Sequence, residues 1–486
     1  MPLSTLTPQP LWQWFSQLCA IPHPSKHEEA IAQHIVDWAT SKGLSVTRDN
    51  VGNVIIKKDA TPGYEDRKGV VMQAHLDMVP QKNNDTDHDF ITDPIKPYID
   101  GDWVTAEGTT LGADNGIGLC AILAVFDDDT IEHGPLEALL TVDEEAGMTG
   151  AFGLEAGYLD GEILLNTDSE DEGEVYMGCA GGVDANATFA LDTEAAPADH
   201  TALSIVIEGL KGGHSGVDIH LGRGNANKVL TRVLFELADK YQVRLASIEG
   251  GSLRNALPRE AVAEVLVPTN NVTDFKADIA TLTETFKQEL AAVEPDLAIF
   301  VDPGEDSDTV LALDLQRRLL AALYSIPHGV FRMSDEIEGV VETSNNLGVI
   351  KTRGNKIHVQ CLIRSLMDSR RIDAQNTIGS IFSLAGATVE FTGAYPGWKP
   401  DTSSQIMSVV RDTYNDLFGE IPKIMVIHAG LECGLFKDAY PHWDMVSYGP
   451  TIRFPHSPDE KVLIDTVERF WQLTLAILKN IPKKSA

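Results

Sequence analysis

The chain has 486 residues, of which 43% are hydrophobic and 23% are charged, as in a globular protein of two or three domains. Its formal net charge of -34 argues against nucleic acid or an anionic membrane as a partner. No apolar run approaches the length that spans a bilayer, and the first residues, MPLSTLTPQP, lack the basic and apolar regions of a signal peptide.

The cysteines are odd in number and far apart, and none forms a C-x-x-C pair. They are Cys19, Cys120, Cys179, Cys361 and Cys433. This pattern predicts neither a disulfide framework nor a thiolate zinc site. A reducing cytoplasm is the simplest compartment for such a chain.

Residues 1–184 alternate between helical and strand patterns. Ser25-x-x-Glu28 is typical of a capping box that begins a helix ending near Gly43, and a hairpin is predicted around Val51-Gly52. Three apolar runs are predicted as buried strands, and Asp114–Phe126 as a helix that is apolar almost all round. The runs are GVVMQAHLDMV, LEALLTV and EILLNTD. Strands that alternate with helices indicate a mostly parallel sheet covered on both faces.

The pattern changes after about residue 184. ATFALDT and ALSIVIEGL alternate as half-exposed antiparallel strands do, and residues 225–241 and 273–293 are predicted helices. Residues 185–395 therefore form a predicted α+β domain, and the α/β pattern returns in residues 396–486. We expect one α/β domain, residues 1–184 and 396–486, that is interrupted by an inserted α+β domain.

Histidine and acidic residues follow three of the buried strands. His75 and Asp77 end the first, Glu144 and Glu145 follow the second, and Asp168 ends the third. Asp114 begins the apolar helix, and His456 lies in a proline-flanked loop before the last helix. Taken singly, these residues are ordinary surface pairs, an N-cap, loop acids and a turn residue. Asp143, beside the two glutamates, is interpreted as solvated.

Taken together, they indicate a metal site. The carboxyl ends of parallel strands meet at one edge of a sheet, and a tight rim of acids without a cation would be strongly destabilising. Two imidazoles and several carboxylates, without thiolate, suit Zn²⁺, Mn²⁺ or Co²⁺ rather than Ca²⁺. The set is large enough for two ions that share a bridging carboxylate, and such pairs activate water for hydrolysis.

Five motifs resemble those of metallopeptidase family M20, and within it those of the bacterial aminoacyl-histidine dipeptidases. They are His75-Leu-Asp77, Gly-Ala-Asp114-Asn-Gly, Glu144-Glu145-Ala-Gly, Asn-Thr-Asp168-Ser-Glu and His456-Ser-Pro. The resemblance extends over nearly the whole chain, through GCAGG, GLKGGHSG, LRNALPRE, CLIRSLMDS, GAYPGWKPD and HAGLECGLF. It implies a zinc-peptidase catalytic domain interrupted by a lid and dimerisation domain.

The resemblance also implies residue roles. His75 and Asp168 would bind one metal ion, Glu145 and His456 the other, and Asp114 would bridge the two. Zn²⁺ is expected, with Co²⁺ or Mn²⁺ as alternatives. Asp77 would orient His75, and Glu144 would be the general base for attack by a water that the two ions share.

The inserted domain would supply the substrate contacts. His214 matches the family's lid histidine, which stabilises the oxyanion from the second subunit of a homodimer, and Asn255 and Arg364 match positions that hold the substrate's backbone and free carboxylate. The implied activity is hydrolysis of unblocked dipeptides, Xaa-His among them. Whether His214 acts on its own chain or on its partner stays open.

Three other functions are compatible with parts of the sequence. Gly116-Ile-Gly-Leu-Cys-Ala121 fits the dinucleotide fingerprint G-x-G-x-x-A, but no strand runs directly into it and an acidic rim would repel a pyrophosphate. A non-catalytic metal-binding protein would not need Glu144. The main alternative is a related amidohydrolase or aminoacylase that acts on N-acyl amino acids.

Overall fold

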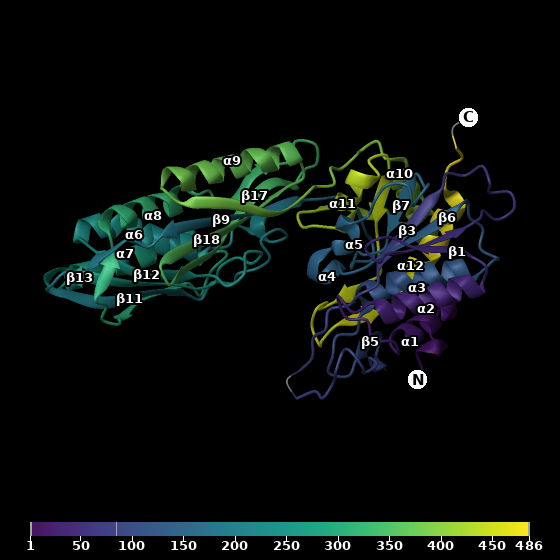
Figure 1. Ribbon diagram of the computed structural model, residues 1–486, viewed down its shortest axis with the longest axis horizontal. Helices are drawn as coiled ribbons and strands as arrows, with labels where there is room; N and C mark the ends of the chain where they lie inside the picture. Colours follow the sequence, from purple (N-terminus) through teal and green to yellow (C-terminus); the bar gives the residue numbers. More distant parts are fainter. Residues whose placement is uncertain (1, 84, 485–486) are drawn as a thin grey trace. The chain divides into compact units, whose positions relative to one another are not determined.

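The computed structural model describes residues 2–83 and 85–484, and these form two compact units (Figure 1). The first unit comprises Met1–Gly178, Trp398–Val426 and Leu431–Ala486, and the second comprises Cys179–Gly397 and Ile427–Gly430. The predicted boundaries were 184/185 and 395/396, and the segment Ile427–Gly430 was not expected in the second unit. It lies there because the main-chain N–H of Ala180 donates to the carbonyls of Ile427 and Ala429.

The first unit is built on an eight-stranded sheet. Its order is β1 (Ser45–Arg48), β2 (Val54–Lys58), β6 (Leu136–Thr141), β3 (Val70–His75), β7 (Ile163–Asn166), β21 (Asp444–Ser447), β8 (Glu174–Cys179) and β20 (Lys423–Ile427). The four central strands, β6, β3, β7 and β21, are parallel, whereas β1, β2 and β8 pair antiparallel with their neighbours. The sheet is therefore parallel at its centre and mixed at its edges.

A smaller sheet of the first unit brings together segments from opposite ends of the chain. Its order is β22 (Ile452–Arg453), β23 (Lys461–Leu463), β5 (Trp103–Ala106) and β4 (Pro97–Asp100). The helices of this unit are α1 (Gln9–Leu18), α2 (Glu29–Ser41), α3 (Ala113–Asp127), α4 (Glu144–Gly147), α5 (Thr149–Phe152), α10 (Gln405–Phe418), α11 (Glu432–Ala439) and α12 (Ile464–Asn480), with the 3₁₀ turn Leu3–Thr5.

Helix α3 is the central helix of this unit. Every residue from Asn115 to Phe126 is buried, as its nearly continuous apolar sequence predicts. It packs against α1 and β3, so its N-terminal turn is held beside the C-terminal end of β3. Among the described residues, no helix is both long enough and apolar enough to traverse a bilayer.

The second unit has its own core and a nine-stranded sheet. The order is β14 (Ala298–Pro303), β11 (His200–Glu208), β13 (Ala261–Pro268), β12 (Arg244–Gly250), β17 (Val341–Arg353), β18 (Lys356–Ser365), β9 (Gly181–Ala190) and β19 (Thr388–Tyr395), with β16 (Gly329–Met333) paired to β17. Neighbouring strands of this sheet pair antiparallel. A separate pair joins β10 (Thr193–Ala195) to β15 (Thr309–Leu311).

Four helices accompany this sheet. They are α6 (Ala226–Tyr241), α7 (Val272–Glu289), α8 (Leu313–Ser325) and α9 (Asp368–Leu384), with 3₁₀ turns at Ile219–Leu221 and Thr269–Asn271. Helix α6 packs against β11 and β13, and α9 against β9 and β18. Burial alternates along β11, as expected for a strand with one face against helices, so this unit is the predicted α+β fold.

Candidate active site

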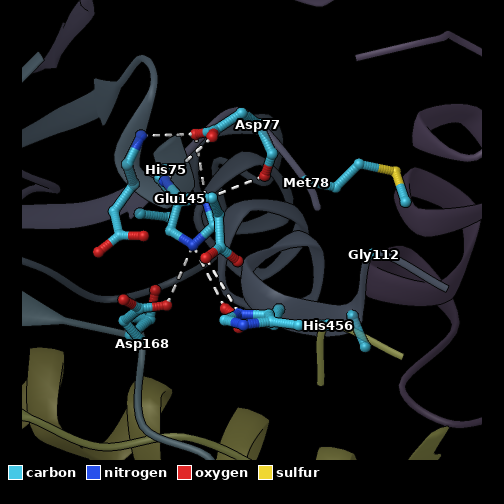
Figure 2. Close-up of polar contacts among 12 residues, drawn as sticks. His75, Asp77, Met78, Gly112, Glu145, Asp168 and His456 are labelled. Carbon is cyan, nitrogen blue, oxygen red and sulfur yellow. Dashed lines mark hydrogen bonds and ion pairs between the residues drawn. The ribbon is translucent and has the colours of Figure 1, made fainter. Parts of the chain in front are cut away.

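The acidic and histidine side chains at the strand ends converge in the first unit (Figure 2). His75 ends β3, Glu144 and Glu145 begin α4 directly after β6, and Asp168 follows β7. Asp114 lies in the first turn of α3, and His456 comes from the loop between β22 and β23. Parallel β6, β3 and β7 bring three of these segments to one sheet edge.

Asp114 lies between the two histidines. Its Oδ1 is 3.3 Å from His75 Nε2, and its Oδ2 is 3.4 Å from His456 Nε2. Asp168 Oδ1 is 3.4 Å from His75 Nε2, and Glu145 Oε2 is 3.0 Å from His456 Nε2. Two groups, His75–Asp114–Asp168 and Asp114–Glu145–His456, share the Asp114 carboxylate, and a third comprises His75, Glu144 and Glu145. In each group the candidate ligand atoms lie within 4.8 Å of one another.

Strong electrostatic perturbation accompanies this convergence. Hydrogen bonds to Asp114 and Glu145 raise the pKa of His456 to about 11. Burial alone would lower the pKa of His75, yet Asp168 and Asp114 hold it well above its ordinary value. Burial raises the pKa of Asp168 to about 7 and raises that of Glu144 well above its usual range. The buried acids and histidines thus lie so close together that their charges do not fully compensate one another.

The donor set fits divalent cations. Each cluster offers one imidazole nitrogen and carboxylate oxygens from two further residues, with no thiolate among them. Glu145 Oε1 is buried and has no hydrogen-bond partner among the described residues. A buried carboxylate oxygen normally accepts a hydrogen bond, so a buried oxygen without a donor is expected where a cation would be its partner. The residues present therefore fit two divalent ions of the Zn²⁺, Mn²⁺ or Co²⁺ class.

The Asp77 carboxylate holds the turn that carries the two glutamates. Its Oδ1 accepts from the main-chain N–H of Glu144 at 3.0 Å, and its Oδ2 accepts from the main-chain N–H of Glu145 at 3.2 Å and from the Ser25 hydroxyl at 2.7 Å. Burial would raise the pKa of Asp77, but hydrogen bonds from His75, Ser25 and Glu144 lower it to about 2.

Two sequence interpretations near this turn are wrong. Ser25 and Glu28 form no capping box, because α2 begins at Glu29 and has no side-chain cap. Ser25 donates to Asp77 instead, and Glu28 accepts from the main-chain N–H of Asp143 at 3.0 Å. Asp143 is not solvated: it is 5% exposed, and its Oδ2 accepts from the Thr149 hydroxyl. Sequence reasoning also did not single out Glu460, whose buried carboxylate contacts the Asp114 turn.

A second cluster lies within the second unit. His214 Nδ1 accepts from the main-chain N–H groups of Gly216 and Val217, so the ring proton of the neutral imidazole sits on Nε2. Burial and the neighbouring Arg364 lower the pKa of His214 to about 4, which keeps the ring neutral at pH 7. Its Nε2 lies 3.4 Å from Arg364 Nη2, so two donor groups face the same space.

Arg364, on β18, is only 5% exposed. Its Nη1 donates to the Tyr395 hydroxyl at 2.9 Å, and in the part of the chain that the structure describes its Nε has no hydrogen-bond partner and no carboxylate lies within ion-pair distance. A buried guanidinium without an acid is costly unless an anion joins it. The main-chain carbonyl of Asn255 accepts from the main-chain N–H of Ser215, which is next to His214 in the sequence. Asn255 itself is an exposed residue.

Comparisons with known proteins identify the family to which the chain belongs. The chain is 54% identical to the cytosol non-specific dipeptidase of Escherichia coli strain K12, over 99% of each chain. A crystal structure of aminoacylhistidine dipeptidase from Vibrio alginolyticus superposes with a TM-score of 0.93 at 60% identity, covering 100% of this chain and 99% of the other. Aminopeptidase PepT from Bacillus cereus shares the fold, with a TM-score of 0.62 at 18% identity over 98% and 99% of the two chains. Residues 71–480 match the sequence profile of peptidase family M20/M25/M40, and the chain belongs to that family.

Proposed function

We propose that this protein is a metal-dependent dipeptidase that hydrolyses unblocked dipeptides, Xaa-His dipeptides among them. The observation that carries the proposal is the Asp114 carboxylate, which faces His75 with one oxygen and His456 with the other. A carboxylate whose two oxygens face different ligand groups can bridge two metal ions, and paired metal ions are suited to hydrolysis.

The proposed ligands follow the two clusters. His75 and Asp168 bind one ion, Glu145 and His456 bind the other, and Asp114 bridges them. Zn²⁺ is the proposed metal, with Co²⁺ and Mn²⁺ as alternatives that the same donors accept. When bound, such a pair lowers the pKa of water and polarises the carbonyl of the scissile bond.

Glu144 is the proposed general base. Its main chain is fixed by Asp77, and its pKa is raised well above the usual range by burial. A carboxylate with a raised pKa can take a proton from the attacking water and return it to the leaving amine. The adjacent Glu145 faces His456, so neighbouring glutamates are free to serve different purposes.

The second unit supplies the proposed substrate contacts. Arg364 is proposed to bind the substrate's free carboxylate, because it is buried and lacks an acidic partner among the described residues. His214 is proposed to donate from Nε2 to the developing oxyanion, for which a neutral imidazole is suited. Asn255 is proposed to contact the substrate's backbone.

The two most similar relatives described above are named as dipeptidases, and this favours dipeptides over the N-acyl amino acids of the alternative hydrolase. The Escherichia coli relative is named a cytosol enzyme, and we propose a cytoplasmic location for this protein too. We also propose a homodimer assembled through the second unit, whose sheet ends in β14 and β19. An unpaired edge strand is a natural site of self-association.

The test is a dipeptide panel on protein stripped of metal and reconstituted with Zn²⁺, Mn²⁺ or Co²⁺. We expect no hydrolysis by the stripped protein, recovery with two equivalents of metal per chain, and cleavage of Xaa-His dipeptides. Activity that survives chelation in protein without stoichiometric metal would contradict the proposal. Preference for N-acyl amino acids over free dipeptides would favour the alternative hydrolase.

A further inference from the structure

Glu460 is a buried carboxylate that gathers a whole turn of main chain. The residue is 2% exposed. Its Oε2 accepts from the main-chain N–H groups of Leu111 and Gly112 at 2.8 and 2.9 Å, and its Oε1 accepts from those of Ala113 and Asp114 at 2.8 and 3.2 Å. Four successive N–H groups thus converge on one side chain that lies some 350 residues away in the sequence.

The turn that Glu460 holds presents Asp114. Gly112 adopts a left-handed conformation with φ of 73°, and a Cβ there would lie 3.1 Å from Met78 Sδ, so the chain needs glycine at this point (Figure 2). Asp114 itself has non-helical φ and ψ although it lies within α3. Its direction is therefore set by contacts with other residues and not by helix geometry alone.

Glu460 also belongs to the segment that carries His456. Its main-chain N–H donates to the Ser457 carbonyl at 2.9 Å, which closes the loop after His456. Its own carbonyl accepts from the Thr105 hydroxyl at 2.7 Å, and β23 follows directly and pairs with β5. One residue thus ties the His456 loop to the Asp114 turn and anchors both to the small sheet.

A simple helix cap is the alternative explanation, because an acid at a helix N-terminus is stabilising wherever it occurs. Two facts favour a more specific role. Within residues 2–83 and 85–484, Glu460 has no Lys, Arg or His ion-pair partner, so its contacts are with the turn itself. The segments that it joins carry the two residues, Asp114 and His456, whose side chains already meet at 3.4 Å.

We propose that Glu460 is a positioning residue for the metal pair: its carboxylate holds the Asp114 turn in register with the His456 loop, so that both side chains face the same ion. The inference rests on the proposed function. In this role Glu460 neither contacts the substrate nor transfers a proton. Removal of residues that orient metal ligands typically lowers metal affinity about 10–100-fold.

The chain offers a matched control in Glu137. This side chain is also buried in the first unit, at 6% exposure, and it too accepts from main-chain N–H groups, those of Asp160 and Gly161. It lies near the start of β6, at the opposite end of that strand from Glu144. Glu137 also pairs with Lys57 Nζ at 2.8 Å, so Glu137→Gln weakens an ion pair as well as main-chain contacts, but it touches no turn that bears a proposed ligand.

The experiment measures metal binding to purified wild type, Glu460→Gln and Glu137→Gln by competition with a chromogenic chelator, and records the visible spectrum of the Co²⁺-loaded proteins. The glutamine amide presents its NH₂ group to two N–H donors, so Glu460→Gln cannot hold all four. We expect its metal affinity to fall about 10–100-fold, with an altered Co²⁺ spectrum and activity partly recovered at high metal. Glu137→Gln should lose stability but keep the wild-type affinity and spectrum.

Glu460→Asp serves if Glu460→Gln does not fold, because it keeps the charge and shortens the reach. It should show the same spectral change with a smaller loss of affinity. Wild-type affinity and spectrum in a folded Glu460 variant would overturn the inference and leave Glu460 as a helix cap, as would equal losses in the Glu137 control. A wild-type protein that binds no divalent ion would contradict the proposed function itself, a result distinct from either.

Discussion

His75 Nδ1 lies 2.9 Å from the main-chain oxygen of Asp77 and 3.4 Å from its carboxylate. The nearer partner of this imidazole is thus the backbone, and the Asp77 carboxylate also accepts from the main chain at Glu144 and Glu145. Asp77 joins the strand that ends in His75 to the turn that carries the proposed base. If Asp77 only oriented His75, its contacts with the main chain of Glu144 and Glu145 would be unexplained.

Asp77→Asn should therefore lower kcat even at saturating metal. The asparagine NH₂ cannot accept from a main-chain N–H, so the turn at Glu144 loses one of its two contacts with this side chain. We expect kcat to stay at least about tenfold below wild type, since a small misplacement of a base is costly. Ser25→Ala, which removes only one donor to Asp77, is the milder control. Full recovery of kcat with added metal would limit Asp77 to metal binding.

Substitution of the two adjacent glutamates should have different effects, on kcat for Glu144 and on metal binding for Glu145. Glu144→Gln is expected to keep the fold and the metal while kcat falls about 10²–10⁴-fold, the usual contribution of a general base. Glu145→Gln is expected to weaken metal binding, because Glu145 Oε2 faces His456 at 3.0 Å. Metal content and kcat measured on both variants check this. Near-normal turnover of Glu144→Gln at saturating metal would place the base elsewhere.

Residues of this site can be predicted from the sequence where a local pattern marks them, but not where their role depends on contacts with distant segments. His75, Glu144, Glu145 and Asp168 could be found because each lies at the end of an apolar strand or within a few residues after it, and parallel strands bring their ends together. The capping-box prediction for Ser25 and Glu28 is wrong because a local capping pattern and a long-range contact use the same residue types. No pattern in the sequence around Glu460 indicates its contacts with the Asp114 turn, because the two segments lie far apart in the sequence and only the fold brings them together.

The substrate's free carboxylate should be essential if Arg364 binds it. Dipeptides amidated at the C-terminus should be poor substrates for the wild type. Arg364→Lys should raise KM for free dipeptides about 10–100-fold, because lysine cannot make a two-point contact with a carboxylate. The difference in KM between free and amidated dipeptides should therefore become smaller in this variant. Arg353→Lys, at an exposed pair with Glu249 in the same unit, is the control. Rapid cleavage of amidated dipeptides by wild type would contradict this assignment.

His428 should make the second unit less stable in acid. It is buried, its Nε2 contacts the Ser344 hydroxyl at 2.8 Å, and burial together with Arg364 and His214 lowers its pKa to about 3. Below its ordinary pKa of about 6.5 the unfolded chain takes up a proton that the folded protein does not, so the free energy of unfolding falls from about pH 6.5 down to about pH 3.

The comparison of His428→Asn with wild type isolates this contribution, since other groups titrate in both proteins. Urea unfolding, followed by hydrogen exchange in the second unit at several pH values, should show a shallower loss of stability on acidification for the variant. His200→Asn, at the half-buried start of β11, should behave as wild type. An unchanged pH dependence in His428→Asn would mean that this ring is protonated without cost.

The proposed dimer can be tested by mixing inactive variants. Glu144→Gln and His214→Ala should each be nearly inactive as homodimers. If His214 serves the partner's metal cluster, a mixed dimer has one working pocket, in which the Glu144→Gln chain supplies His214 to a chain with intact Glu144. Dissociation and random re-pairing should then restore up to about a quarter of wild-type activity, by the symmetry of a two-fold dimer.

The double variant Glu144→Gln/His214→Ala mixed with wild type provides the converse control. Under the same arrangement neither pocket of that mixed dimer is complete, so the mixed dimer should be inactive. If each His214 instead serves its own chain, the wild-type half of the mixed dimer should work, and the two single variants should not restore one another although mixed dimers form. Native mass spectrometry verifies pairing in each mixture, so that activity reports only which chain supplies His214.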